Sequence, residues 1–115
     1  MKLIVAIIQP TKTETAREAL EKLEVARLTI CDGQGFARQL GQTEMYRGIQ
    51  YKPRMHRKAI LEIVVNDDFL DRTIETILDV AVTGPDGNIG DGKIFVLPVE
   101  DSIRISDGRS GKEAV

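Results

Sequence analysis

The order of apolar segments along the chain limits its fold most narrowly. An almost unbroken apolar run at residues 3–8 predicts a strand within Lys2–Gln9 that is buried on both faces. Alternating and β-branched residues predict a second strand from Leu28 toward Phe36 and a third over Lys58–Val65. A fourth strand is expected over Lys93–Val99. Four strands in 115 residues favour one small sheet.

Two segments between these strands have the spacing of amphipathic helices. The first follows a candidate capping box of Thr11 and Glu14, and its apolar stripe is Ala16, Ala19, Leu20 and Leu23. The second follows Asn66, Asp67 and Asp68, which suit a helix N-terminus, and its stripe is Leu70, Ile74, Ile77, Leu78 and Ala81. The order β-α-β-β-α-β predicts a single α+β domain over residues 1–115 with a ferredoxin-like fold.

In this fold two helices cover one face of a four-stranded antiparallel sheet, and the other face stays bare. The strands carry apolar residues at adjacent as well as alternate positions, so we expect the second face to be buried too. Residues expected there are Ile4, Leu28, Ile63 and Phe95. A domain this small can bury them only against other subunits, which predicts a homo-oligomer.

Composition excludes several classes of protein. A content of 42% hydrophobic and 30% charged residues is ordinary for a globular domain. The chain has no apolar run of about 20 residues and no signal peptide, so a cytoplasmic location is expected. One cysteine, Cys31, and one histidine, His56, cannot build a structural zinc site. The net charge of −2 gives no general attraction to nucleic acid.

A glycine-rich loop at about residues 83–92 separates the second helix from the last strand. Four glycines (84, 87, 90 and 92) let the backbone bring N–H groups close to an anion, and Lys93 adds a positive charge. The loop is therefore either a phosphate cradle or a glycine-rich turn beside a solvated lysine. Its order, helix then glycines then strand, differs from a Walker loop, so a cradle here would belong to another fold.

A long segment at about residues 38–57 joins the second and third strands. Between residues 38 and 58 there are six basic residues and one acidic residue, a charge of +5 in a chain of −2. About twenty residues without a clear period form either a solvated mobile loop or a functional one. Tyr46 and Tyr51 lie within it, where exposed tyrosines suit contact with a partner or covalent modification.

Several motifs together resemble the PII nitrogen-regulatory signal-transduction proteins. The resemblance covers essentially Met1 to Val115 and is carried by Gly35-Phe36, Arg38-Gln39, Gly41, Thr43-Glu44, Tyr46-Arg47-Gly48, Tyr51, Lys58, residues 62–65, Thr83-Gly84, residues 90–100 and Arg104. A Tyr-Arg-Gly loop combined with a distant Gly-Asp-Gly-Lys-Ile-Phe block is highly specific for this family.

The resemblance implies a homotrimer that binds ATP or ADP in clefts between subunits and senses 2-oxoglutarate through Mg-ATP. Its T-loop, here about residues 38–57, would dock on a transporter, a regulator or a metabolic enzyme. The nucleotide would be bound by Ile7, Thr29, Arg38, Gln39, Glu62, Val64, Gly90, Asp91, Gly92, Lys93 and Arg104. Gln39 would also help to hold magnesium, Gln39 and Lys58 would hold 2-oxoglutarate, and Tyr51 matches a tyrosine that some members have uridylylated.

Departures from the family pattern leave an alternative open. Ala37 stands where glycine is usual, Pro85 to Asn88 lengthen the glycine-rich loop by about three residues, and Ser106 replaces a second phosphate-binding arginine in the C-terminal segment, residues 100–115. The alternative is a divergent paralogue that senses adenylates, does not respond to 2-oxoglutarate and regulates a non-nitrogen partner such as another transporter. An enzyme is not expected, because no carboxylate pair or Cys/His couple stands out.

Overall fold

The computed structural model describes residues 1–25, 27–37 and 54–115. These residues form four strands, two α-helices and two short 3-10 helices: β1 (Lys2–Ile8), η1 (Pro10–Lys12), α1 (Thr13–Lys22), β2 (Thr29–Ala37), β3 (Arg54–Val65), α2 (Asp67–Ala81), β4 (Gly92–Pro98) and η2 (Gly111–Ala114). In the described part of the chain, no helix is long and apolar enough to cross a membrane.

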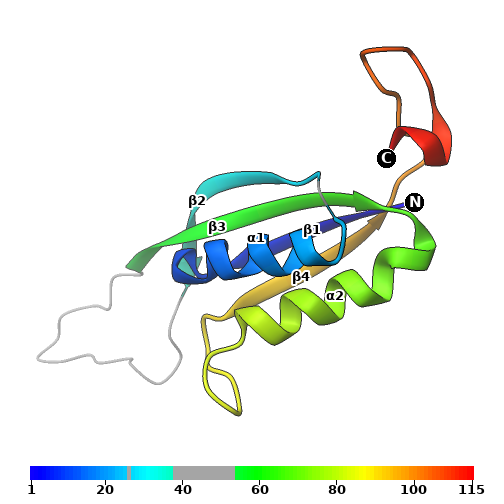
Figure 1. Ribbon diagram of the computed structural model, residues 1–115. Coiled ribbons are helices and arrows are strands. Elements are labelled where there is room, and N and C mark those ends of the chain that lie inside the picture. Colours follow the sequence, from blue (N-terminus) through cyan, green and yellow to red (C-terminus); the bar gives the residue numbers. More distant parts are fainter. Residues whose placement is uncertain (26, 38–53) are drawn as a thin grey trace, which may run out of the picture.

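The four strands form one antiparallel sheet in the order β2-β3-β1-β4. Both helices lie on the same side of this sheet, with α1 and α2 next to each other (Figure 1). The structure therefore confirms the ferredoxin-like α+β fold predicted from the order of segments.

The core lies between the sheet and the two helices. Ile4, Ala6 and Ile8 alternate along β1 and are fully buried there, with Leu61 and Ile63 of β3 beside them. The helices contribute Leu20 from α1 and both Thr73 and Ile77 from α2, all fully buried.

The prediction of residues on the bare face of the sheet is largely wrong. Ile4 and Ile63 pair across β1 and β3, and both face the helices. Leu28 also packs against this core, so only Phe95 lies on the open face. Because both faces of the strands are apolar, the sequence pattern does not reveal which set of alternate residues points to the helices.

The open face presents apolar side chains from the neighbouring strands β1 and β4. Leu3, Val5 and Ile7 of β1 are half-buried. Their β4 neighbours Phe95 and Leu97 are 48% and 43% exposed. The other side of the sheet is the one covered by α1 and α2, so within one chain this face keeps a continuous apolar surface.

The start of the first helix also differs from the expected capping box. Helical winding already begins in η1 at Pro10, and the residue that precedes α1 is Lys12, which makes no side-chain capping bond. Proline fits the first position of a helical turn because its φ is fixed there, so Thr11 lies inside the turn and does not cap it. For α2 the predicted position is right, since Asn66 is the extended residue before the helix, but Asn66 makes no side-chain capping hydrogen bond either.

Two strand boundaries shift relative to the prediction. β3 begins at Arg54, not at Lys58, because β2 continues to Ala37 and pairs with it residue by residue. The predicted loop of residues 38–57 therefore overlaps β3 by four residues, and its remaining part, 38–53, lies outside the described residues. β4 spans Gly92–Pro98, so the glycine-rich loop ends where this strand begins.

Candidate functional site

The glycine-rich loop is closed by the carboxylate of Asp91. Its Oδ2 accepts hydrogen bonds from the backbone N–H of Thr83 at 3.0 Å and of Asn88 at 2.9 Å. Its Oδ1 accepts the Thr83 hydroxyl at 2.6 Å. The Thr83 hydroxyl, together with these backbone N–H groups, holds the pKa of Asp91 below its usual range. At neutral pH the carboxylate is therefore charged and ties both ends of the loop together.

The same loop is fixed to the sheet through one carbonyl. The Lys58 ammonium donates to the Gly90 carbonyl oxygen at 2.7 Å, and the Gln9 amide reaches the same oxygen at 3.4 Å. Lys58 comes from β3, and Gln9 follows β1. Residues from three separate parts of the chain thus meet at Gly90.

A groove of about 620 Å³ lies beside this junction, on the open-face side of the sheet. Ile7 and Phe95 form part of its apolar wall, and Gly90 and Gly92 form part of its rim. Three cationic side chains line it: Arg57, Lys58 and Lys93. Among the described residues that line it none is acidic, so an anion that also has an apolar or aromatic part would suit it.

The structure brings together Ile7, Lys58, Gly90, Gly92 and Lys93 from the residues predicted by resemblance. Asp91 is adjacent but uses its carboxylate within the loop. Three predicted residues lie outside the described part of the chain. They are Arg38, predicted to bind nucleotide, Gln39, predicted to bind nucleotide, 2-oxoglutarate and magnesium, and Tyr51, predicted to be modified.

The remaining predicted residues lie elsewhere on the chain. Thr29 and Glu62 are exposed and directly opposite each other on β2 and β3, and the half-buried Val64 lies two residues further along β3. These three residues share the open face with Ile7, because Glu62 and Val64 pair with Val5 and Leu3 of β1. None of the three lines the groove.

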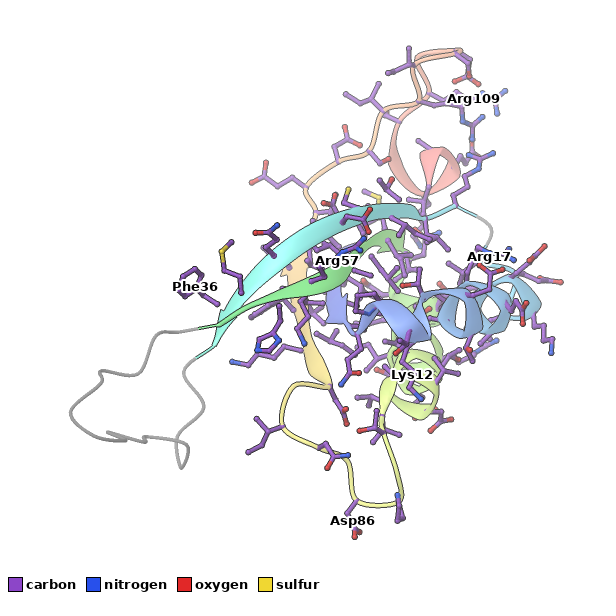
Figure 2. All side chains as sticks on the ribbon, turned by 90° about the vertical axis from the view of Figure 1, so that its left-hand side faces the viewer. Lys12, Arg17, Phe36, Arg57, Asp86 and Arg109 are labelled. Atoms are coloured by element: carbon purple, nitrogen blue, oxygen red, sulfur yellow. The ribbon has the colours of Figure 1, made fainter. Side chains whose placement is uncertain are left out.

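Arg104 lies in the C-terminal segment, at the opposite end of the molecule from the glycine-rich loop (Figures 1 and 2). In Figure 2, Asp86 marks the tip of the loop at the bottom of the view, and Arg109 marks the C-terminal segment at the top. The Arg104 guanidinium pairs with Asp107 at 3.1 Å and also donates to the Glu113 carbonyl oxygen. Within one chain, Arg104 and Lys93 therefore cannot act on the same ligand.

Reasoning from the sequence missed three residues that shape the site. Gln9 binds both Gly90 and Asp91, and it is the one polar residue between an apolar strand and Pro10. Asn88 lies in the lengthened loop and donates its side-chain amide to the Thr83 hydroxyl at 2.7 Å. Thr83 was noted only as part of a family motif, although a threonine and an asparagine beside a Gly-Asp-Gly sequence favour such local bonding.

The described residues contain no group of three or more His, Cys, Asp or Glu side chains that could hold a metal ion. Cys31 is exposed on β2.

Comparison with known proteins adds independent information. A family model described as nitrogen regulatory protein P-II matches residues 1–109. Nitrogen regulatory protein P-II 2 of Methanothermobacter thermautotrophicus is 48% identical over 115 residues, covering 100% of this chain and 97% of that protein. Nitrogen regulatory protein GlnK1 of Methanosarcina mazei is 43% identical with the same coverage, and nitrogen regulatory protein P-II of Azospirillum brasilense is 44% identical over the full length of both chains.

Proposed function

The chain belongs to the P-II family of nitrogen regulatory proteins, and on that premise we propose that it is a cytoplasmic signal-transduction protein that binds ATP or ADP. It senses 2-oxoglutarate together with Mg-ATP and regulates a partner in nitrogen metabolism through the T-loop segment. The observation that carries the proposal is the groove lined by Arg57, Lys58 and Lys93, with no acidic side chain among its described lining residues.

Phosphate groups suit the glycine-rich end of this groove. Lysine ammonium groups bind phosphate as point charges, and glycines without a Cβ allow backbone N–H groups to approach the phosphate oxygens. Gly90, Gly92 and Lys93 supply both features next to each other. The apolar walls at Ile7 and Phe95 leave room for the less polar part of a nucleotide.

The separation of the predicted residues supports a site shared between subunits. Lys93 and Arg104 lie at opposite ends of the molecule, and the open face along β4 between them exposes the apolar side chains of Phe95 and Leu97. In a closed ring, a heterologous contact places one end of each subunit against a different surface of its neighbour. We propose a homotrimer in which Arg104 of one subunit completes the phosphate site of the next, while Thr29, Glu62 and Val64 contact the base and ribose.

For 2-oxoglutarate we propose Lys58 as the partner of a carboxylate, with Gln39 helping to hold the ligand and the magnesium that arrives with ATP. Charge-assisted hydrogen bonds of this kind are among the stronger polar contacts in proteins. The Lys58 ammonium now donates to Gly90 at 2.7 Å, so binding of 2-oxoglutarate must compete with this bond.

The Lys58–Gly90 hydrogen bond is also the observation that supports one alternative function. If the Lys58–Gly90 bond persists when nucleotide is bound, the protein responds to adenylates alone and controls a partner outside nitrogen uptake. Titration with 2-oxoglutarate separates the two functions, because only the first requires Lys58 to change partner.

The test is calorimetry with ATP and ADP, each with and without magnesium and 2-oxoglutarate, on the wild-type protein and Lys58→Ala. Loss of a hydrogen bond to a charged group costs about 1.5–3 kcal/mol. We therefore expect Lys58→Ala to weaken 2-oxoglutarate binding about ten- to a hundredfold and to change ADP binding much less.

Lys22→Ala is the matched control, since Lys22 is an exposed lysine in the last turn of α1 and should leave both ligands unaffected. Equal losses of ADP and 2-oxoglutarate in Lys58→Ala would mean that Lys58 only holds the loop. No response of the wild type to 2-oxoglutarate would establish the alternative function, and no binding of either nucleotide would refute the proposal.

A further inference from the structure

We propose that Asp91 is a positioning residue that holds the glycine-rich loop in its anion-binding shape and does not itself touch the ligand. The inference rests on the proposed function for the identity of the ligand, but the geometry of the loop stands by itself. It corrects the simplest expectation from the sequence, in which all four residues of Gly90-Asp91-Gly92-Lys93 face the phosphates.

The carboxylate of Asp91 has no capacity left for a ligand or its metal. A carboxylate offers about four acceptor positions. Asp91 receives the Thr83 and Asn88 backbone N–H groups, the Thr83 hydroxyl and, at 3.4 Å, the Gln9 amide. Because these positions are filled by donors from the loop and from Gln9, the carboxylate orders the protein's own groups around itself.

Asn88 stabilises the lengthened loop through a second set of hydrogen bonds. Its side-chain amide donates to the Thr83 hydroxyl at 2.7 Å and lies 3.5 Å from the Thr83 carbonyl oxygen. Its own carbonyl accepts the Asp91 backbone N–H at 3.2 Å. The base of the loop is therefore closed between residues 83 and 91, and the extra residues protrude beyond it, with Asp86 at the tip (Figure 2).

Closing the base determines where the functional part of the loop lies. The Gly90 carbonyl meets Lys58 and Gln9, and Gly92 enters β4 opposite Ile8. Asp91 is the residue between these two anchors. If its bonds were lost, Gly90 and Lys93 would no longer be held at one fixed spacing beside the groove, and an anion would have to order them on binding.

The experiment compares Asp91→Asn with Asp86→Asn on the full-length protein. Both remove one negative charge from the same loop, but Asp86 is exposed and accepts no hydrogen bond from the described residues. Hydrogen exchange measures how fast the backbone N–H groups of Thr83 and Asn88, which donate to Asp91, exchange with solvent. Calorimetry measures the affinities for ADP and for adenosine, two ligands that differ only in the phosphates.

We expect Asp91→Asn to speed exchange of both amides at least about tenfold and to weaken ADP about tenfold or more, with adenosine unchanged. Asp86→Asn should alter none of these quantities. Asn88→Ala should act in the same direction as Asp91→Asn but less strongly, and it provides a second test if Asp91→Asn does not fold.

Two results would overturn the inference. Weaker ADP binding with both amides still protected would mean that the Asp91 charge contacts the ligand or its metal directly. Faster exchange with unchanged ADP affinity would mean that the shape of the loop is irrelevant to binding. If the wild type binds no ADP, the proposed function fails, while the exchange rates still decide whether Asp91 closes the loop.

Discussion

Replacing Gly92 with alanine is expected to lower the free energy of unfolding by about 3 kcal/mol or more. A Cβ at this position would lie 1.7 Å from the Ile7 carbonyl oxygen and 2.8 Å from its carbonyl carbon. The backbone of Gly92 also has a φ of +120°, which side chains rarely permit. Ile7 belongs to β1, which pairs with both β3 and β4. This strand therefore cannot move away from a new Cβ without breaking its backbone hydrogen bonds to a neighbouring strand.

Gly84→Ala is the matched control, because Gly84 also has a positive φ of +67° but a Cβ there would meet nothing within 4 Å. Only backbone strain remains, about 1–2 kcal/mol. Urea unfolding at one fixed chain concentration compares the two variants, since association would otherwise shift the apparent stability. If Gly92→Ala is no less stable than Gly84→Ala, the start of β4 does not approach β1 as closely as the structure indicates.

The fold could be predicted because each element has a local cause. The apolar stripe of α2 places Ile77 and Ala81 in the core, and Asn66 before the helix adopts the extended conformation expected of an N-cap residue. Such periodic signals depend only on neighbouring residues. The same signals also showed that Leu70 and Ile74 would lie on the buried side, where they pack against the core.

Predictions that required pairing information were less accurate. The sequence shows where an apolar strand lies, but not which of its faces meets the helices when both are apolar. Ile4 and Val5 look alike in the sequence, yet Ile4 is in the core and Val5 is on the open face. The start of β3 at Arg54 depends likewise on β2. Residues 54–57 carry no local strand pattern, and they form a strand by pairing with residues 34–37.

The candidate site was predictable as a motif but not as a geometry. Glycines and a lysine in one short block predict, from local sequence alone, either a phosphate cradle or a glycine-rich turn beside a solvated lysine. The contacts that fix this block join residues far apart, Gln9 with Asp91 and Lys58 with Gly90, separated by 82 and 32 positions. No local pattern predicts such contacts, and none indicates that Arg104 lies at the opposite end of the molecule from the glycine-rich loop.

The last prediction concerns the proposed trimer and Phe95, which lies on the open face in the edge strand β4. We expect Phe95→Asp to convert the proposed homotrimer into single chains of 12.8 kDa at micromolar concentration. Phe95 is 48% exposed in one chain and lies opposite Val5 of β1. Full burial of such a side chain is worth about 1.5–3 kcal/mol, and enclosing an unpaired carboxylate costs several kcal/mol more at each of the equivalent positions.

Light scattering after size exclusion measures the mass, and circular dichroism checks that the chains remain folded, as expected for a side chain outside the helix-covered core. Leu78→Asp is the control, because Leu78 is 56% exposed on α2, on the other layer of the molecule. If both variants dissociate, the contact is not confined to the open face. If Phe95→Asp remains trimeric, that face does not form the interface, and the nucleotide site cannot be completed by a neighbouring Arg104 through this contact.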